Sequence, residues 1–320
     1  MGHLHLLIGR IFFISLLLSG CAQQLKNIVF NPIDSFRIES LGNGIYVHHG
    51  QHLDIDEGYQ GDICNISFVV GSLGVAVIDT GGSLKVGKQL LQAIQKITDK
   101  PILYVINTHV HPDHIFGNAA FLQTNGLEPQ FVGHAKLAAA MQLREVAYRK
   151  LNSQYLGVDV QGSDIVKPSI MVASVMDLSL GDRTLTITPY PNAHTNTDIS
   201  IIESQTGTLF TGDLLFIERT PVIEGDINGL IATIELLKTY PVKQVVPGHG
   251  PVSKQWLKAI NNQQRYLKVL LSDIRANIKA GKSMEQAMDS AAESERNNWK
   301  LFNVANRRNV NTIYPALEWE

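Results

Sequence analysis

The stretch Thr108-His109-Val110-His111-Pro112-Asp113-His114 decides how the rest of the chain is interpreted. It places three imidazoles and one carboxylate within six residues, directly after the apolar run Ile102–Ile106, which is typical of a buried strand. Imidazole nitrogen and carboxylate oxygen suit zinc and, less selectively, iron, manganese or cobalt. Because the chain has only two cysteines and no cysteine cluster, a structural zinc knot is excluded and a catalytic metal site is predicted.

Three later segments carry further ligand candidates. They are Asn192-Ala193-His194-Thr195, Thr211-Gly212-Asp213 and Gly248-His249-Gly250, and each lies where a predicted strand meets a loop. Glycine allows backbone to approach a crowded metal centre and permits the positive φ that such turns require. A lone histidine is more often a hydrogen-bonded core or surface residue, but five histidines in this pattern favour one shared centre.

The order of strands and helices predicts an α/β (α+β) fold. The strand 74–78, the helix 84–97 with its helical apolar period, and the strand 102–106 form a unit whose carboxyl end carries the histidines. The second half repeats this layout, which predicts a sandwich of two sheets with helices outside. Its expected strands are 176–180, 183–190, 200–203, 208–210 and 244–246, and the other expected helices are 113–122, 135–151, 230–237, 255–280, 284–292 and 309–318.

Composition limits the classes of function. The chain has 320 residues, of which 44% are hydrophobic and 18% charged, enough for one large domain or two fused lobes. The net charge is -2 and no long basic run occurs, so no nucleic-acid partner is expected. A small-molecule substrate is the natural expectation for a catalytic metal site.

The first 20 residues are typical of a secretory signal, with Arg10 before the apolar run Ile11–Leu18 and then small residues. The segment is too short to span a bilayer. The junction Leu18-Ser19-Gly20-Cys21 resembles a bacterial lipoprotein signal, which implies lipid on Cys21 as the membrane attachment; an ordinary cleaved signal is the alternative. Ala22 resembles outer-membrane sorting, so we expect a lipid-anchored protein on the periplasmic side, at the outer membrane, with residues 21–35 as a tether.

The remaining cysteine, Cys64, would then have no partner for an intramolecular disulfide. Its apolar neighbours Ile63, Ile66 and Phe68 predict a small buried residue within a strand.

Together, these segments resemble the metallo-β-lactamase superfamily from about Tyr46 to His249. The resemblance implies a four-layer αββα sandwich at residues 36–254, with residues 255–320 as a C-terminal helical extension packed on the same domain. It also implies a dinuclear centre with two Zn²⁺, or else iron or manganese. The first metal would be held by His109, His111 and His194, the second by Asp113, His114 and His249, with Asp213 bridging both and Asp79 hydrogen-bonding the loop that presents the histidines.

Such a centre leaves room for a bridging water between ions about 3.5–4 Å apart, and shared coordination gives hydroxide near neutrality. That hydroxide would be the nucleophile. Asp113 would orient it or accept its proton, so Asp113 and Asp213 are the predicted catalytic residues.

Differences from individual subfamilies leave two hydrolytic functions open. Subclass B1 and B2 lactamases use cysteine where Asp213 stands, and subclass B3 lactamases lack a bridging carboxylate there. Glyoxalase II-like thioesterases share the bridging aspartate, but their substrate-binding C-terminal residues have no clear equivalent here. A B3-like β-lactamase and a glyoxalase II-like thioesterase therefore both stay possible functions.

Stretches outside the ligands are most similar to the quinoprotein relay system zinc metallohydrolases. These stretches are Tyr46-Val47-His48-His49-Gly50-Gln51-His52, Gly133-His134-Ala135-Lys136 and Gly212-Asp213-Leu214-Leu215-Phe216. This resemblance implies an exported hydrolase with a periplasmic quinoprotein dehydrogenase system as a possible partner, and it leaves the substrate open. An iron persulfide dioxygenase using His109, His111 and His194, and a non-catalytic metal-binding maturation factor, are two further functions compatible with the sequence.

Several other polar residues have a weaker assignment. His48, His49 and His52 are expected in a solvated turn, and His134 at a helix start. Arg307 and Arg308 are expected as surface charges, with neutralisation of an anionic substrate as the alternative.

Overall fold

The strand–helix–strand unit before the histidine motif forms as predicted, to within one residue. It consists of β4 (Val75–Ile78), α1 (Leu84–Ile97) and β5 (Ile102–Ile106). The Ser83 side chain caps α1 by accepting a hydrogen bond from the Val86 backbone N–H. The computed structural model describes residues 36–54, 59–122 and 127–320, so the predicted signal peptide, Cys21 and the tether lie outside the described residues.

Two sheets form the centre of the fold. The seven-stranded sheet has the order β1 to β7, adding β1 (Glu39–Gly42), β2 (Ile45–His48), β3 (Ile66–Val70), β6 (Gln130–His134) and β7 (Ile170–Val172). The five-stranded sheet has the order β12-β11-β10-β9-β8, formed by β8 (Met176–Ser179), β9 (Thr184–Pro189), β10 (Ile199–Glu203), β11 (Thr208–Phe210) and β12 (Gln244–Val246). Strands β4 to β7 are parallel, so their carboxyl ends meet at one edge.

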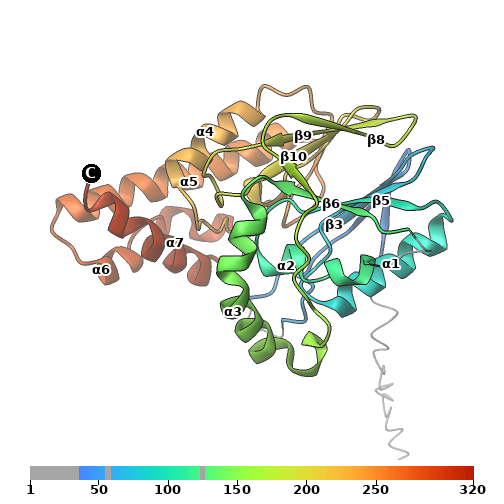
Figure 1. The fold of residues 1–320 in the computed structure, drawn as a ribbon. Coiled ribbons are helices and arrows are strands. Elements are labelled where there is room, and N and C mark those ends of the chain that lie inside the picture. Colours follow the sequence, from blue (N-terminus) through green and yellow to red (C-terminus); the bar gives the residue numbers. More distant parts are fainter. Residues whose placement is uncertain (1–35, 55–58, 123–126) are drawn as a thin grey trace, which may run out of the picture. The chain divides into compact units, whose positions relative to one another are not determined.

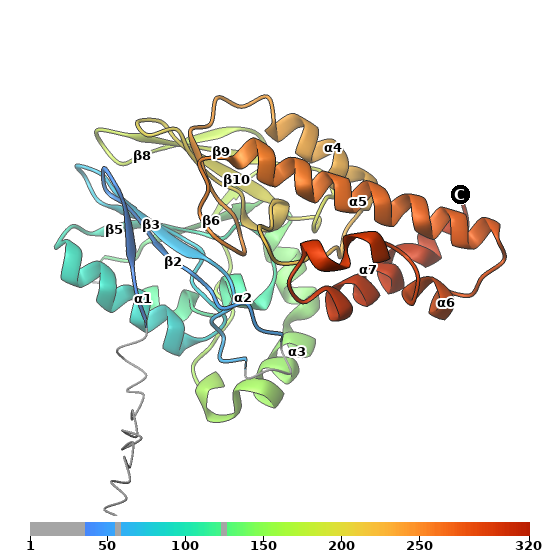
Figure 2. The same ribbon diagram turned by 180° about the vertical axis from the view of Figure 1, so that it is seen from behind.

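Successive side chains of a strand point to opposite faces of the sheet and so pack into different layers. In β4, Val75 and Val77 pack in a cluster with Leu90 and Ile94 of α1, whereas Ala76 belongs to the cluster between the two sheets. Helices cover both outer faces, and the order helix, sheet, sheet, helix is visible in Figures 1 and 2. The predicted αββα sandwich is therefore confirmed.

The helices divide between the two faces. α1 and α2 (Pro112–Ile115) lie with α3 (Leu137–Leu156) beside the seven-stranded sheet, and α4 (Ile227–Leu237) and α5 (Trp256–Lys279) beside the five-stranded sheet (Figure 1). α6 (Met284–Met288) and α7 (Phe302–Leu317) pack with α5 in the apolar cluster that also holds α4. The 3₁₀ segments are η2 (Asn118–Phe121), η3 (Gly157–Val160), η4 (Gly212–Leu214) and η5 (Glu293–Asn298).

Several helix predictions were wrong in extent: α6 ends at 288 and not at the predicted 292, and α4 begins at 227 and not at the predicted 230. The helix expected at 113–122 is broken into α2 and η2 around Gly117, whose position tolerates no side chain because a Cβ would lie 2.0 Å from the Thr80 carbonyl oxygen. α3 runs five residues further than the predicted end at 151. α7 starts at Phe302, before the predicted 309, and β7 was not predicted.

Residues 36–320 form one unit by their backbone contacts. The proposed boundary at residue 254, between the sandwich and the helical extension, stays a prediction. No helix in the described part of the chain combines the length and apolar character needed to cross a bilayer.

Candidate metal centre

The predicted ligands come from segments that follow strand ends. His109 follows β5, His194 follows β9, and His249 follows β12. Asp213 lies in η4, directly after β11, and Asp113 and His114 lie in α2. All seven predicted ligand side chains are brought together, although they span both sheets.

The conformation of α2 separates the side chains of the histidine motif. His111 is the N-cap residue with extended backbone (φ -67°, ψ 149°), and Pro112 occupies the first helical turn, where its missing N–H has no partner to lose. Asp113 and His114 follow within the helix, so adjacent residues leave the backbone in different directions. One short segment can therefore supply ligands to two neighbouring positions.

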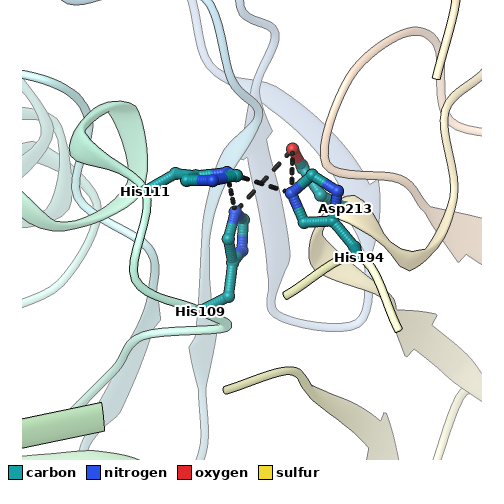
Figure 3. Close-up of side chains that lie close together, drawn as sticks. All are labelled: His109, His111, His194 and Asp213. Atoms are coloured by element: carbon teal, nitrogen blue, oxygen red, sulfur yellow. Dashed lines mark hydrogen bonds and ion pairs between the residues drawn. The ribbon is translucent and has the colours of Figure 1, made fainter. Parts of the chain in front are cut away.

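The first group consists of His109, His111, His194 and Asp213 (Figure 3). His111 Nδ1 lies 3.0 Å from both His109 Nε2 and His194 Nε2. Asp213 Oδ2 lies 3.7 Å from His109 Nε2 and 3.3 Å from His194 Nε2. Three imidazole nitrogens and a carboxylate oxygen thus surround one point.

The second group shares Asp213 with the first. His114 Nε2 and His249 Nε2 each lie 3.5 Å from Asp113 Oδ2. Asp213 Oδ1 is 3.3 Å from His114 Nε2, and Asp213 Oδ2 is 3.3 Å from His249 Nε2. Asp213 therefore contacts histidines of both groups, as a bridging ligand must.

The donor atoms fit cations. His114 Nε2 and Asp213 Oδ1 are buried and have no hydrogen-bond partner in the described part of the chain. Unpaired buried polar atoms are costly, and metal coordination would satisfy both atoms at once. Imidazole nitrogens and carboxylate oxygens in such groups suit divalent metal ions.

The second nitrogen of each imidazole is also held in place. These contacts are His109 Nδ1 with Thr108 Oγ1 at 3.0 Å, His111 Nε2 with Glu224 Oε2 at 2.9 Å, His114 Nδ1 with Asp79 Oδ2 at 2.8 Å, His194 Nδ1 with the Val222 carbonyl at 2.7 Å, and His249 Nδ1 with the Ile63 carbonyl at 2.7 Å. Such contacts fix the ring orientation and the nitrogen that is presented to a metal.

The electrostatic environment differs among the ligand candidates. Burial lowers the pKa of His109 well below its ordinary value and that of His194 to about 4, so both rings are neutral and present lone pairs. Burial opposes the charged form of His114 too, yet the carboxylates of Asp113, Asp213 and Asp79 raise its pKa well above the ordinary value. Burial likewise disfavours a charged Asp213, but the surrounding histidines, His249 first, hold its pKa well below the usual range.

Asp79 supports the histidine loop from behind. Its Oδ1 accepts a hydrogen bond from the Thr108 backbone N–H at 2.8 Å, and its Oδ2 contacts Thr108 Oγ1 and His114 Nδ1, both at 2.8 Å. Asp79 itself has left-handed backbone (φ 57°), a conformation that aspartate and asparagine tolerate better than most residues.

We expect Asp79→Asn to weaken metal binding by about 10–100-fold, because the charge that orients the His114 ring is lost while the backbone conformation is retained. Metal-dissociation constants measured by competition with a chelator check this expectation. Asp99→Asn, a change at an exposed carboxylate, is the control. Equal affinity in the two variants would contradict the role given to Asp79.

Glu224 is a site residue that the sequence analysis missed. Its contact with His111 Nε2 is accompanied by a pKa lowered to about 2, chiefly through the charge of His111. Glu224 stands alone between Ile223 and Gly225, far from the histidine motif along the chain. No local pattern marks it, because its partner is set by the fold.

Three other predictions have outcomes in the structure. Cys64 is buried as expected (1% exposed), but it lies in a bend before β3 and not within a strand, and its Sγ–H donates to the Asp113 carbonyl at 2.8 Å. The solvated turn expected at residues 48–52 was wrong for His48, which is 4% exposed and stacks on the Phe36 ring at 3.8 Å. His134 was expected at a helix start but is the last residue of β6; it accepts a hydrogen bond from the backbone N–H of Lys136, which is the N-cap residue of α3.

The C-terminal helices fix the loop that follows Asp213. Gln263 of α5 accepts a hydrogen bond from the Phe216 backbone N–H at 2.7 Å and donates to the Leu214 carbonyl at 2.8 Å. Asn309 of α7 accepts from the Ile223 backbone N–H at 3.0 Å and donates to the Pro221 carbonyl at 2.7 Å. The loop that carries Val222 and Glu224 is therefore held in place by side chains of α5 and α7.

Asn309→Ala is expected to destabilise the fold by about 1–3 kcal/mol, because buried backbone groups lose their partners. It should also lower turnover, since the Val222 carbonyl that holds His194 lies in the same loop. Chemical unfolding and a rate assay on the same preparations measure the two effects. Asn303→Ala, an exposed position on α7, should leave both values near wild type, and a neutral Asn309→Ala would contradict this role for Asn309.

The sandwich and the strand-end cluster of histidine and aspartate define a class of metal-dependent protein. The family model described as "Metallo-beta-lactamase superfamily" matches residues 59–249, and the chain belongs to this superfamily. Its members bind metal ions, and the His/Asp groups of this chain are suited to that role.

Individual relatives are hydrolases by name. A metallo-beta-lactamase type 2 from Bacillus sp. is 28% identical over 78% of this chain and 91% of its own. A hydroxyacylglutathione hydrolase from Polaromonas sp. is 30% identical over 55% of this chain and 60% of its own. A linear primary-alkylsulfatase from Pseudomonas sp. is 45% identical over 49 residues, which are 15% of this chain and 9% of its own. The chain thus spans less than two thirds of the last two proteins.

Solved structures agree on the fold. A metallo-beta-lactamase from Pontibacter korlensis superposes with a TM-score of 0.58 at 20% identity, covering 72% of this chain and 98% of its own. The inverting sec-alkylsulfatase Pisa1 from Pseudomonas sp. gives a TM-score of 0.68 at 16% identity, covering 87% of this chain and 50% of its own. The predictions of the superfamily and of a hydrolase family are confirmed at this level.

Proposed function

We propose that this chain is a hydrolase with two metal ions, Zn²⁺ in the first instance, that acts on a small-molecule substrate. The position of Asp213 carries the proposal, since one buried carboxylate contacts histidines of both ligand groups. A single-metal protein has no need for the second group of Asp113, His114 and His249. The intact second group also disfavours a persulfide dioxygenase that uses one iron on His109, His111 and His194.

In this proposal His109, His111 and His194 would hold one ion, Asp113, His114 and His249 would hold the other, and Asp213 would be shared by both. Bound there, a pair of divalent ions lowers the pKa of water and polarises a carbonyl or ester oxygen. Asp113 Oδ2 lies 3.5 Å from both His114 Nε2 and His249 Nε2, and Asp113 lines a cavity of about 170 Å³, where it could accept a proton from an attacking water. Phe216, stacked on the His249 ring at 5.0 Å, lines the same cavity and gives it an apolar surface beside the ligands.

Zinc is proposed because imidazole and carboxylate ligands suit it, and such sites also accept iron or manganese according to supply. Metal quantification by mass spectrometry tests the metal part of the proposal. A ratio near two metal ions per chain supports it, whereas one iron and no zinc favours the dioxygenase.

A substrate panel on the same protein identifies the bond. The panel contains a chromogenic cephalosporin, a lactone, a thioester, a phosphoester and an alkyl sulfate ester. The first and third test for a B3-like β-lactamase and a glyoxalase II-like thioesterase, and the sulfate ester is included because of the similarity to two alkylsulfatases. A metal-loaded protein that hydrolyses none of them would favour the non-catalytic maturation factor.

We further propose export and lipid attachment at Cys21, on the periplasmic side of the outer membrane, with a quinoprotein dehydrogenase system as partner. The support is the signal-like sequence before Cys21 and the resemblance to the quinoprotein relay system zinc metallohydrolases. Fractionation of cells that produce the wild type or Cys21→Ala tests the attachment. Release of only the variant from the membrane fraction is the expected result, and equal membrane association would contradict it.

A further inference from the structure

Arg219 has an unusual environment for a buried arginine. The residue is only 7% exposed, and it lines the cavity that also contains Asp113, Asp213 and His249. Its Nη1 is buried without a hydrogen-bond partner in the described part of the chain. A buried guanidinium normally has a carboxylate or several acceptors around it, because the loss of hydration is costly.

The backbone around Arg219 is firmly held, so its position does not reflect a loose loop. Lys300 pairs with both neighbours of Arg219, its carbonyl accepting from the Thr220 N–H at 3.0 Å and its N–H donating to the Glu218 carbonyl at 2.7 Å. Lys300 Nζ also pairs with Glu218 Oε2 at 2.6 Å. The fold thus holds the arginine in the cavity wall.

The negative charges near Arg219 have other partners. Burial lowers its pKa, and Asp113, Asp213 and Asp54 are the groups that act against this shift. Asp113 and Asp213 belong to the metal groups, and Asp54 Oδ1 pairs with Arg308 Nη1 at 3.3 Å at the same cavity. With metal ions bound, the cationic charge around Arg219 would increase further.

A further carboxylate lines the cavity, and it is not among the charges that act most strongly on Arg219. Glu224, which contacts His111, lines the side of the first ligand group. An anion would therefore be repelled there and attracted toward Arg219, beside Asp113 and His249 of the second group. A cavity of about 170 Å³ has room for one small anionic group there.

We propose that Arg219 binds an anionic oxygen group, carboxylate or sulfate, of the substrate, and so makes the enzyme selective for small anions oriented with that group toward the second metal position. This inference rests on the proposed function and adds the substrate class to it. Arg219 presents donors for oxygen acceptors, and an oxyanion would supply the partner that the described residues do not give to Nη1. Arg308 lines the same cavity, but its charge is paired with Asp54.

The test is anion binding to the full-length, zinc-loaded protein, measured by titration calorimetry in a buffer without other oxyanions. The probes are monomethyl succinate (a carboxylate), methyl sulfate (a sulfate) and methyl succinamate (a neutral analogue of the first). We expect the wild type to bind at least one anion about tenfold more tightly than the neutral probe, and Arg219→Gln to remove this preference. Arg219→Lys should retain part of it.

Arg307→Gln is the matched control, because it also removes one positive charge, at the residue of α7 next to Arg308. Arg307 pairs with Glu285 and Asp289 and is not among the residues lining this cavity. Loss of carboxylate binding alone, sulfate binding alone, or both in Arg219→Gln identifies the anion class and supports the proposal. Unchanged anion preference in Arg219→Gln, or an equal loss in Arg307→Gln, overturns it.

Thermal stability separates binding from a structural role. In the absence of anions, Arg219→Gln should unfold at the wild-type temperature or above it, because an unpaired buried cation is removed, and its melting temperature should no longer rise on adding the anion. A lowered melting temperature with retained anion preference would show a structural role instead. Metal content and the substrate panel, measured on the same samples, report on the proposed function independently of anion binding.

Discussion

Asp213→Asn is expected to lower the metal content from about two ions to one or fewer and to reduce kcat/KM by at least about 10²–10³-fold, the size of effect seen when one key electrostatic contact leaves an active site. The substitution is nearly isosteric, so the loss would come from charge and coordination. Asp213 contacts four of the five predicted histidine ligands: His109, His114, His194 and His249. No other carboxylate of the described residues lies in both groups.

An asparagine at position 213 would present an amide N–H group to the imidazole nitrogens that face the centre. The histidine rings cannot easily turn away, because the second nitrogen of each ring has its own partner. The substitution also leaves the charge of two bound cations opposed mainly by Asp113. Metal quantification and steady-state kinetics on the same preparation give the two readouts. Asp177→Asn, at an exposed carboxylate of β8, should retain both metal ions and full activity. Metal-dependent turnover at the wild-type rate in Asp213→Asn would refute the bridging role.

The parts of the fold that were predictable are those with a strong local pattern. β4, α1 and β5 have apolar periods that match their structures almost residue for residue, because each buries a defined face against a neighbouring layer. The ligands His109, His194 and His249 were found for a related reason: each follows a strand, beside small residues, where a two-sheet fold gathers its strand ends.

What the sequence did not predict depends on tertiary contacts. The break between α2 and η2 comes from the close approach of Gly117 to Thr80, which no helical period records. His48 is polar, yet a stacked Phe36 ring and the Asp62 carboxylate, 2.8 Å from its Nε2, make its burial possible. Glu224 and Arg219 lie on a loop whose position is set by α5 and α7, so their partners cannot be inferred from adjacent residues.

Gly248→Ala is expected to disrupt the centre without removing any ligand. A Cβ at this position would lie 2.0 Å from Asp213 Oδ1 and 2.7 Å from the Gly212 carbonyl carbon. Backbone movement is resisted on both sides, since the Gly248 N–H donates to the Gly212 carbonyl at 2.8 Å and its carbonyl accepts from the Asn65 N–H at 2.7 Å. We expect a loss of about 1–3 kcal/mol in stability from overpacking and about a 10²-fold loss of activity from displacement of Asp213 or His249.

A control variant at a second glycine distinguishes the effect of local backbone strain from the effect of damage to the metal centre. Gly281 has left-handed backbone (φ 70°) and open space where a Cβ would stand, so Gly281→Ala costs backbone strain of about 1–2 kcal/mol and contacts nothing near the ligands. The two variants can therefore lose similar stability in chemical unfolding. Only Gly248→Ala should also lose metal ions and activity, because only there does the added methyl group meet the carboxylate shared by both ligand groups. Gly248→Ala could bind two metal ions and turn over at the wild-type rate only if Asp213 were free to move away from the added methyl group. That result would contradict the fixed position that its contacts with His114, His194 and His249 indicate.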